Sequence, residues 1–138
     1  MSNSTKSKVR SFRDLLVWQQ SLELVIQTYR LTEVFPRREM YGIVAQIRGA
    51  AVSIPANIAE GHARSTTKDY LRFLGIATGS LREFETYCEI SKRLEYASQS
   101  QMAQIAKLAN SIGAMLARLC FTLRGKRGDR GIREVRTP

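Results

Sequence analysis

The chain has 138 residues, of which 43% are hydrophobic and 25% are charged, and its formal net charge is +10. This length and balance indicate one globular domain that can bury a core without disulfides or a metal ion. The longest uncharged runs, such as residues 49–59, contain 11 residues. A membrane-spanning helix needs about 20, so we expect a soluble protein with no membrane partner.

A basic arm is expected at the beginning of the chain. Residues 1–13 contain four basic residues, no acidic residue and no apolar segment of the kind that a secretory signal needs. Such a composition is typical of disordered chain. We therefore predict a disordered arm over residues 1–10 and a cytoplasmic location.

The first two helices of a bundle are predicted to follow. Ser11 begins a capping box, and the first helix is expected to run to Phe35, because a residue before proline avoids the helical region. The second helix is expected over residues 39–64, where Pro55 must kink or restart it. Apolar residues at helical spacing give each helix a predicted core stripe. The first stripe is Leu15, Leu22, Ile26 and Tyr29, widened by Trp18 and Val25, and the second is Met40, Ile43, Ile47, Ala51, Ile54 and Ile58.

Two more helices are predicted, each introduced by an N-cap. Thr66 precedes the third helix, which is expected to end near Tyr96, and Ser98 precedes a fourth helix that ends at the stretch 125–131. Four helices with short connections predict an all-α protein, an antiparallel up-down four-helix bundle over residues 11–124. The third stripe is Tyr70, Leu74, Ala77, Leu81, Phe84, Cys88 and Ser91, and the fourth is Met102, Ile105, Ala109, Ile112, Leu116, Leu119 and Leu123.

Additional apolar and small residues indicate helix faces that meet a close neighbour. Phe73, Ile76 and Tyr87 give the third helix a second apolar face, which is buried either inside the bundle or between subunits.

Small residues also recur at helical spacing on the second and third helices. We interpret them as close contacts between helices of one chain or of two chains. These small-residue stripes are Gly42, Ala45, Gly49, Ser53 and Ala56, and Gly75 with Gly79.

Most of the net positive charge lies in the two ends of the chain. Residues 124–138 contain six basic residues against two acidic ones, and we predict a basic, disordered tail over residues 125–138. Another basic cluster is expected at the turn between the second and third helices. Basic surfaces attract the phosphates of nucleic acids. The predicted nucleic-acid-binding residues are Arg64, Lys68, Arg72, Arg124, Lys126, Arg127 and Arg130.

A polar group is predicted beside the small-residue stripes. Its structural interpretation is helix capping and hydrogen bonding between helices, and the alternative is a binding or catalytic patch. Glu60 and Arg64 are four residues apart and can pair along one helix. The members of this group are Asn57, Glu60, Ser80 and Glu83.

The sequence lacks the residue patterns of common catalytic and metal sites. Its one histidine, His62, lies two residues from Glu60, so the Glu-x-x-His motif of a di-iron bundle is absent. Cys88 and Cys120 fall at apolar helical positions and are expected to be buried free thiols. The sequence also contains neither a phosphate-binding loop nor a nucleophile elbow. We therefore expect no enzymatic activity, no metal and no cofactor.

Three segments together resemble a known family. They are residues 53–61 (SIPANIAEG), residues 77–83 (ATGSLRE) and the opening residues 12–15 (FRDL) with Val17 and Trp18. Over residues 11–120 the chain is similar to the four-helix-bundle family of intervening-sequence proteins of large-subunit ribosomal RNA genes. The resemblance implies a ring-like homopentamer with no established enzymatic activity. The genetic setting of the family implies a link to nucleic acid, and a related accessory protein of retroelements binds RNA and reverse transcriptase.

Two functional hypotheses follow from these observations. The first is a non-enzymatic oligomer that binds nucleic acid, RNA rather than DNA, through its basic surface and arms. The second is a protein-interaction scaffold or accessory subunit, which contacts a nucleic-acid-processing protein without binding nucleic acid itself. A partner that is retained after nuclease treatment would favour the second hypothesis.

Overall fold

The computed structural model describes residues 9–136, with side chains described for residues 9–126. Over this range the chain forms four α-helices, two short 3₁₀ helices and no strand, which confirms the all-α prediction. None of the described helices is long and apolar enough to cross a membrane. The elements are η1 (Phe12–Asp14), α2 (Leu16–Thr32), η2 (Arg37–Glu39), α3 (Ile43–His62), α4 (Thr67–Arg93) and α5 (Gln99–Arg136).

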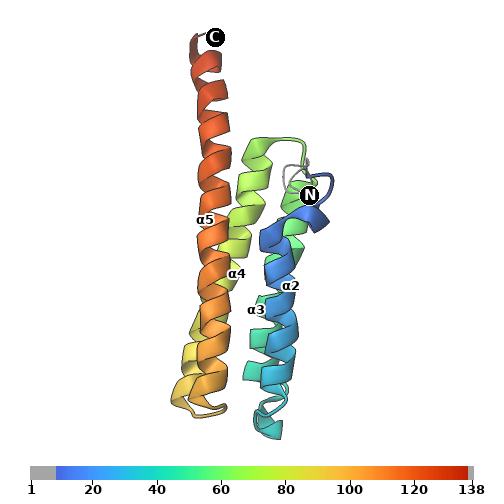
Figure 1. Ribbon diagram of the computed structural model, residues 1–138, viewed down its shortest axis with the longest axis vertical. Coiled ribbons are helices and arrows are strands. Elements are labelled where there is room, and N and C mark those ends of the chain that lie inside the picture. The colour runs from blue at the N-terminus through green and yellow to red at the C-terminus, as the bar shows by residue number, and fades with distance from the viewer. Residues whose placement is uncertain (1–8, 137–138) are drawn as a thin grey trace, which may run out of the picture.

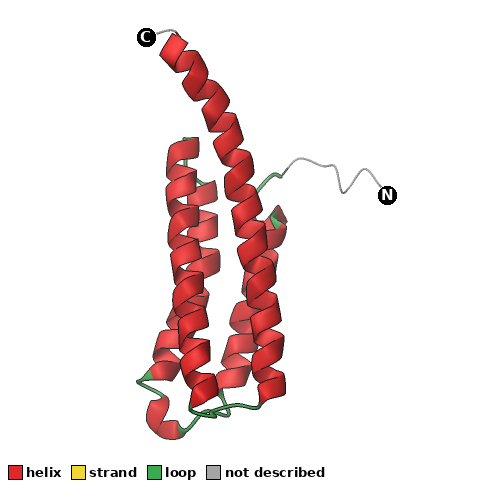
Figure 2. Ribbon diagram, turned by 90° about the vertical axis from the view of Figure 1, so that its left-hand side faces the viewer, coloured by secondary structure: helices red, strands yellow, loops and turns green. Residues whose placement is uncertain are grey.

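The four α-helices lie side by side in one bundle (Figure 1). Helix α3 packs against α2 and α4, while α5 packs against α4 and α2. The α2–α3 and α4–α5 connections lie at one end of the bundle, and the α3–α4 connection lies at the other (Figure 2). We call the latter, around residues 62–67, the α3–α4 end. The element η1 also lies there, in contact with α3, and α5 extends beyond it.

Local side-chain caps begin several of these elements, as predicted. Ser11 forms a complete capping box with Asp14, but this box begins only η1, because Leu15 has an extended backbone (φ −75°, ψ 124°) that separates η1 from α2. The hydroxyl of Thr66 accepts a 3.1 Å hydrogen bond from the Asp69 N–H at the start of α4. The side chain of Ser98 caps α5 in the same way, since it accepts a 3.1 Å hydrogen bond from the Gln101 N–H.

The predicted core stripe of the first helix is half right, since Leu15, Trp18 and Val25 pack against the core. Leu22, Ile26 and Tyr29 are exposed, and α2 instead buries a face that includes three hydroxyl residues. Each hydroxyl donates to a carbonyl one turn earlier on α2, over 2.6–2.8 Å. Burial of these polar groups is therefore inexpensive, because their hydrogen bonds are satisfied within the helix. The buried face consists of Val17, Ser21, Leu24, Thr28, Leu31 and Thr32.

The core predictions for the other helices largely agree with the structure. Met40 is an exception, since it is exposed. Helix α3 continues as one helix across the buried Pro55, so the proline does not restart it. The predicted core residues that are buried are Ile47, Ala51, Ile54 and Ile58 of α3, Leu74, Ala77, Leu81, Phe84 and Ser91 of α4, and Met102, Ile105, Ala109, Ile112 and Leu116 of α5.

The end of the last helix differs from the prediction. Helix α5 runs to Arg136, through most of the segment for which the sequence predicts a disordered tail over residues 125–138. Each glycine costs a helix roughly 1 kcal/mol, but arginine and lysine are good helix formers and no proline interrupts the segment before Pro138. Residues 1–8 of the predicted arm and residues 137–138 of the predicted tail lie outside the described residues.

Candidate nucleic-acid interface

Two of the predicted basic residues are brought together by one aromatic ring. The guanidinium carbon of Arg64 lies 4.6 Å from the centre of the Phe73 ring, and that of Arg72 lies 4.4 Å from it. Both distances are typical of cation–π contacts, which orient the two guanidinium groups. Phe73 itself is buried. The ring therefore positions two exposed cations at the α3–α4 end, and it is not itself available for stacking on a base.

This arrangement depends on the close approach of α3 and α4 at Gly61. A Cβ atom at Gly61 would lie 2.8 Å from the Cβ of Phe73 and 3.3 Å from the carbonyl oxygen of Tyr70. Only glycine leaves room for this contact. Gly61 is buried in the last turn of α3.

The remaining predicted basic residues lie on α4 and α5. Lys68 is exposed in the first turn of α4, between Arg64 and Arg72 in the sequence. On α5, burial raises the pKa of the Cys120 thiol, and the nearby Arg124, one turn later, opposes this shift. Lys126 follows and is exposed. The side chains of Arg127 and Arg130 lie outside the described residues, although their backbone belongs to α5.

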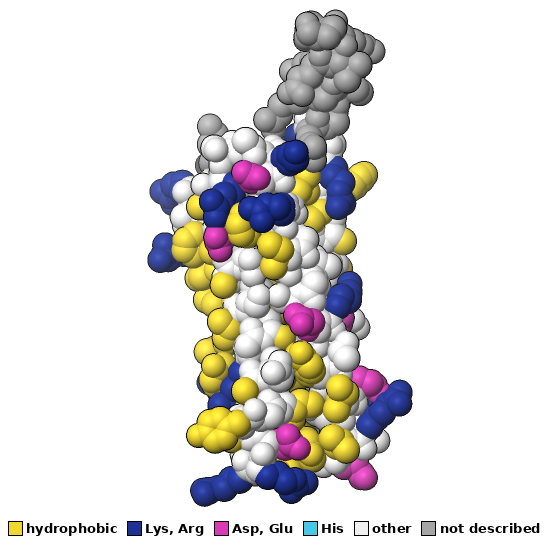
Figure 3. Space-filling model, turned by 180° about the vertical axis from the view of Figure 1, so that it is seen from behind, with side chains coloured by type: hydrophobic (Ala, Val, Ile, Leu, Met, Phe, Trp, Pro, Cys, Tyr) yellow, Lys and Arg dark blue, Asp and Glu magenta, His cyan; other side chains and the backbone are white. Residues whose placement is uncertain are grey.

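Contacts between α4 and α5 place Arg124 of α5 at the same end of the bundle as Arg64, Arg72 and Phe73. Burial, and to a smaller extent the neighbouring Cys120, raises the pKa of Tyr70 to about 12. Tyr70 belongs to the first turn of α4, so Cys120 and Arg124 of α5 pass beside the beginning of that helix. Figure 3 shows Lys and Arg side chains at both ends of the bundle and a largely uncharged surface between them.

Basic side chains outnumber acidic ones at the α3–α4 end. Among residues 9–14, 60–72 and 118–126, which lie at this end, eight side chains are basic and three are acidic. The basic residues of the α3–α4 end are Arg10, Arg13, Arg64, Lys68, Arg72, Arg118, Arg124 and Lys126, and the acidic ones are Asp14, Glu60 and Asp69. The sequence prediction omitted Arg13, which stacks 4.7 Å above the Phe12 ring.

The predicted polar group separates into three parts. Asn57 donates to the hydroxyl of Ser53 over 2.9 Å, and this hydroxyl is 2.7 Å from that of Ser80 on α4, so a hydrogen-bonded network joins α3 to α4. Glu60 pairs with Arg64 over 2.7 Å, as its spacing predicts. Glu83 joins neither of them. The first part supports the structural interpretation of this group.

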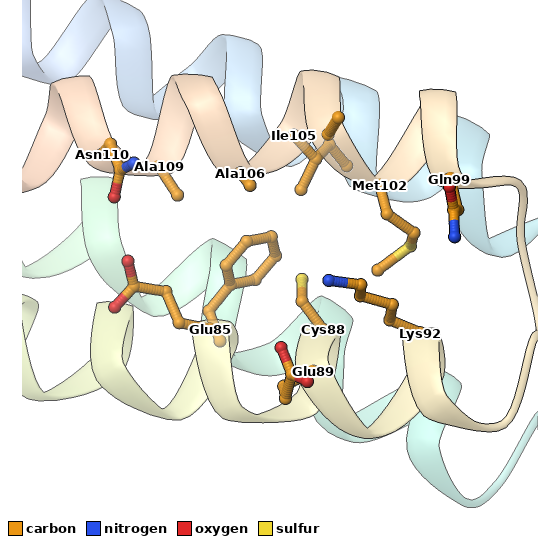
Figure 4. A pocket seen from close by; sticks show the side chains of 12 residues that line it. Glu85, Cys88, Glu89, Lys92, Gln99, Met102, Ile105, Ala106, Ala109 and Asn110 are labelled. Carbon is orange, nitrogen blue, oxygen red and sulfur yellow. The ribbon is translucent and has the colours of Figure 1, made fainter.

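A groove of about 440 Å³ lies between α4 and α5 (Figure 4). Its floor is apolar, with Phe84, Met102 and Ile105, and Figure 4 shows the Cys88 sulfur and the Lys92 ammonium pointing toward one another. Burial, with a smaller effect of Glu85, raises the pKa of Cys88 to about 12. The thiol is therefore protonated at neutral pH, and the groove offers an apolar surface rather than an activated nucleophile.

The remaining candidate residues, His62 and the two cysteines, lie in surroundings that indicate a structural role. His62 lies at the end of α3 with its ring edge-on to Tyr70, at a centroid distance of 5.8 Å. Cys120 is buried, Cys88 is half-buried, and both thiols are free. Among the residues whose side chains the structure describes, no three His, Cys, Asp or Glu side chains gather where they could hold a metal ion.

Comparisons with known proteins agree with this architecture. A family model described as 23S rRNA-intervening sequence protein matches residues 13–118. The chain is also similar to the crystal structure of a protein of unknown function from the S23 ribosomal protein family of Bacteroides thetaiotaomicron, with a TM-score of 0.71 and 25% sequence identity. That match covers 76% of this chain and 98% of the other. No curated protein matches the chain.

Proposed function

The chain belongs to the 23S rRNA-intervening sequence protein family, and from this premise we propose that it is a non-enzymatic protein that binds nucleic acid, RNA rather than DNA. The observation that carries the proposal is the basic α3–α4 end, where Arg64 and Arg72 share the Phe73 ring. Because cations held at fixed positions lose little freedom on binding, this end is suited to contact a phosphate backbone.

The positive field of this end has a second source. Helix α4 begins there, and the N-terminus of a helix carries a partial positive charge that favours phosphate. Lys68 and the two arginines on Phe73 lie in or beside the first two turns of α4, together with the acidic Asp69, and Arg124 lies on the adjacent α5. The contacts are made by side chains and backbone that do not distinguish between bases. We therefore expect affinity that depends strongly on salt and weakly on sequence.

We further propose that the protein functions as a homo-oligomer, a ring of five antiparallel up-down bundles. The placement of the connections at alternating ends of the bundle supports the topology. Exposed apolar residues on α2 support the assembly, since exposed apolar patches mark surfaces that bind a partner. Repetition of the basic end around such a ring would multiply the contacts that one RNA molecule can make, and would raise the avidity.

Fluorescence anisotropy of the full-length protein tests the binding proposal. A labelled single-stranded RNA, and a DNA of the same sequence, would be titrated with protein at several salt concentrations. We expect binding at low salt, tighter for RNA, with log K falling linearly against log salt by about 0.7 for each phosphate contact. Absence of binding to either strand at low salt would refute the proposal.

The groove between α4 and α5 favours a second candidate function, a scaffold that binds another protein. Its apolar floor and its volume of about 440 Å³ would fit side chains of a partner. Affinity capture from the native host, with and without nuclease, separates the two functions. A partner protein that remains after nuclease, together with no RNA affinity of the purified protein, would favour the scaffold.

A further inference from the structure

Helix α2 exposes three large apolar side chains although it buries three hydroxyl residues. The exposed fractions are 39% for Leu22, 46% for Ile26 and 43% for Tyr29, while Ser21 and Thr28 are fully buried. On the adjacent helix α3, Val52 is also 43% exposed. Large apolar side chains on the outer surface of a bundle indicate that another molecule covers that surface. We call Leu22, Ile26, Tyr29 and Val52 the apolar ridge.

Arg48 fixes part of this ridge and carries a charge without an acidic partner. Its Nε donates a 2.8 Å hydrogen bond to the Thr32 hydroxyl, and its guanidinium carbon lies 4.5 Å from the centre of the Tyr29 ring. Among the described residues Arg48 forms no ion pair with a carboxylate. The ridge therefore has a cation in the middle of an apolar surface, held in place by its own neighbours.

A complementary surface adjoins the ridge on the part of α3 that is next to α4. Between α3 and α4 there is a hollow of about 210 Å³ lined by Ala45, Gly49, Ser53, Glu83 and Tyr87, among others, which we call the small-residue hollow. A Cβ atom added at Gly49 would meet nothing within 4 Å. Glu83 is exposed and has no ion-pair partner among the described residues.

Gly49, Gly75 and Gly79 therefore do not mark close contacts between helices of one chain, although Ser53 of the same stripe bonds to Ser80 on α4. Added Cβ atoms at Gly75 and Gly79 also meet nothing within 4 Å, so the chain itself leaves open space beside these glycines. The interpretation of the stripes as close contacts within the bundle is wrong for these positions. The open space beside these glycines leaves room for a second chain.

We propose that the apolar ridge of one copy packs into the small-residue hollow of the next copy, with Arg48 of the first facing Glu83 of the second. The large side chains of the ridge would fill the open space beside Gly49 in the hollow. The positive charge of Arg48 would pair with the negative charge of Glu83. The ridge lies along α2 and the part of α3 next to it, and the hollow lies between α3 and α4, so they are different surfaces that adjoin along the outer face of α3. Their contact is thus heterologous, and a heterologous contact closes into a ring when its rotation permits. This inference rests on the proposed self-assembly.

Light scattering on a size-exclusion column tests the two surfaces. Ile26→Asp places a charge on the ridge, and Gly49→Leu fills the hollow from a position where an added Cβ atom meets nothing within 4 Å. We expect wild-type protein well above the chain mass of 15.6 kDa, and a shift of each variant to monomer with unchanged helical circular dichroism. Leu16→Asp and Gly125→Leu are the matched controls, since both positions are exposed outside the two surfaces, and they should keep the wild-type mass.

Charge reversal tests the pairing of Arg48 with Glu83. Arg48→Glu and Glu83→Arg should each weaken assembly at least tenfold, and the double variant should recover most of the loss. If Ile26→Asp and Gly49→Leu keep the oligomeric mass of the wild type, the assignment of the surfaces is overturned and self-assembly stands. If the wild-type protein is a monomer, both the surfaces and self-assembly are overturned. RNA affinity is measured separately, and it tests the binding proposal whether the protein is a monomer or an oligomer.

Discussion

The hydroxyl of Tyr96 donates a 2.7 Å hydrogen bond to Oε2 of Glu39, a residue 57 positions earlier in the sequence. The other carboxylate oxygen of Glu39 accepts a 3.4 Å hydrogen bond from the Ile43 N–H at the start of α3. The Tyr96 ring also packs 5.5 Å from that of Phe35. One carboxylate thus joins the α4–α5 connection to the beginning of α3, at the end of the bundle opposite the basic cluster.

We expect this contact to make stability depend on pH. The hydrogen bond from Tyr96, followed by that from Ile43, lowers the pKa of Glu39 below its ordinary value of 4.5. Because the pKa is lower in the folded state, the stabilisation is present above 4.5 and is lost as pH falls through the folded-state pKa. Glu39→Gln should therefore lower the melting temperature at neutral pH and lose this effect in acid. Melting curves followed by circular dichroism would measure it, and a pH-independent difference would contradict it.

Replacement of Glu95 by glycine should stabilise the protein. Glu95 has a positive φ of 58° at the end of α4, where its N–H bonds to the Lys92 carbonyl and the Tyr96 N–H bonds to the Ser91 carbonyl. This is the Schellman pattern, which favours glycine at the left-handed position. Glu95→Gly should raise the free energy of unfolding by about 1 kcal/mol, as measured by urea denaturation. The control Glu95→Ala gains nothing, and equal stability of the two variants would contradict the assignment.

Gly61→Ala should destabilise the bundle beside the basic cluster. The new Cβ atom would lie 2.8 Å from the Cβ of Phe73, and overpacking of this kind costs about 1–3 kcal/mol. Gly75→Ala is the matched control, because its Cβ atom has open space and alanine is a better helix former by roughly 1 kcal/mol. Urea denaturation should move the two variants in opposite directions. A Gly61→Ala variant as stable as the control would refute the close contact.

Cys88 should react slowly with alkylating reagents while the protein is folded. Burial raises its pKa from 9.0 to about 12, so its thiolate fraction at pH 8 falls by about a thousandfold, and the thiolate is the reactive form. Mass spectrometry after iodoacetamide treatment should find Cys88 unmodified in the folded protein and labelled in urea. Rapid labelling of folded protein would show that the α4–α5 groove leaves the thiol hydrated.

The sequence predicts most reliably the features that depend on a few neighbouring residues. The N-caps at Thr66 and Ser98 occur as predicted, and Ser11 forms its capping box at η1 rather than at α2, because each cap requires only a hydroxyl and a backbone N–H within three residues. The core stripes of α4 and α5 are also predicted well. The Glu39–Tyr96 contact, in contrast, joins residues that only the complete fold brings together.

The errors have two physical causes. On α2, periodicity favoured Leu22, Ile26 and Tyr29 as core, whereas hydroxyl groups that bond to their own helix allow the opposite face to be buried. In the candidate site, the sequence predicts the cations but not Phe73, which aligns two of them, because Arg64 and Phe73 belong to different helices. Open space at Gly49 and Gly79 likewise follows only from the packing of the chain.

The most direct test of the RNA-binding proposal compares charge removal at the two ends of the bundle. Lys68→Gln with Arg72→Gln removes two cations from the basic end, and Arg30→Gln with Arg37→Gln removes two from the opposite end. RNA affinity would be measured by anisotropy over a range of salt concentrations. We predict that the first pair reduces the slope of log K against log salt by about 1.4 and the second leaves it unchanged. Equal losses for both pairs, or none for the first, would contradict a basic interface at the α3–α4 end.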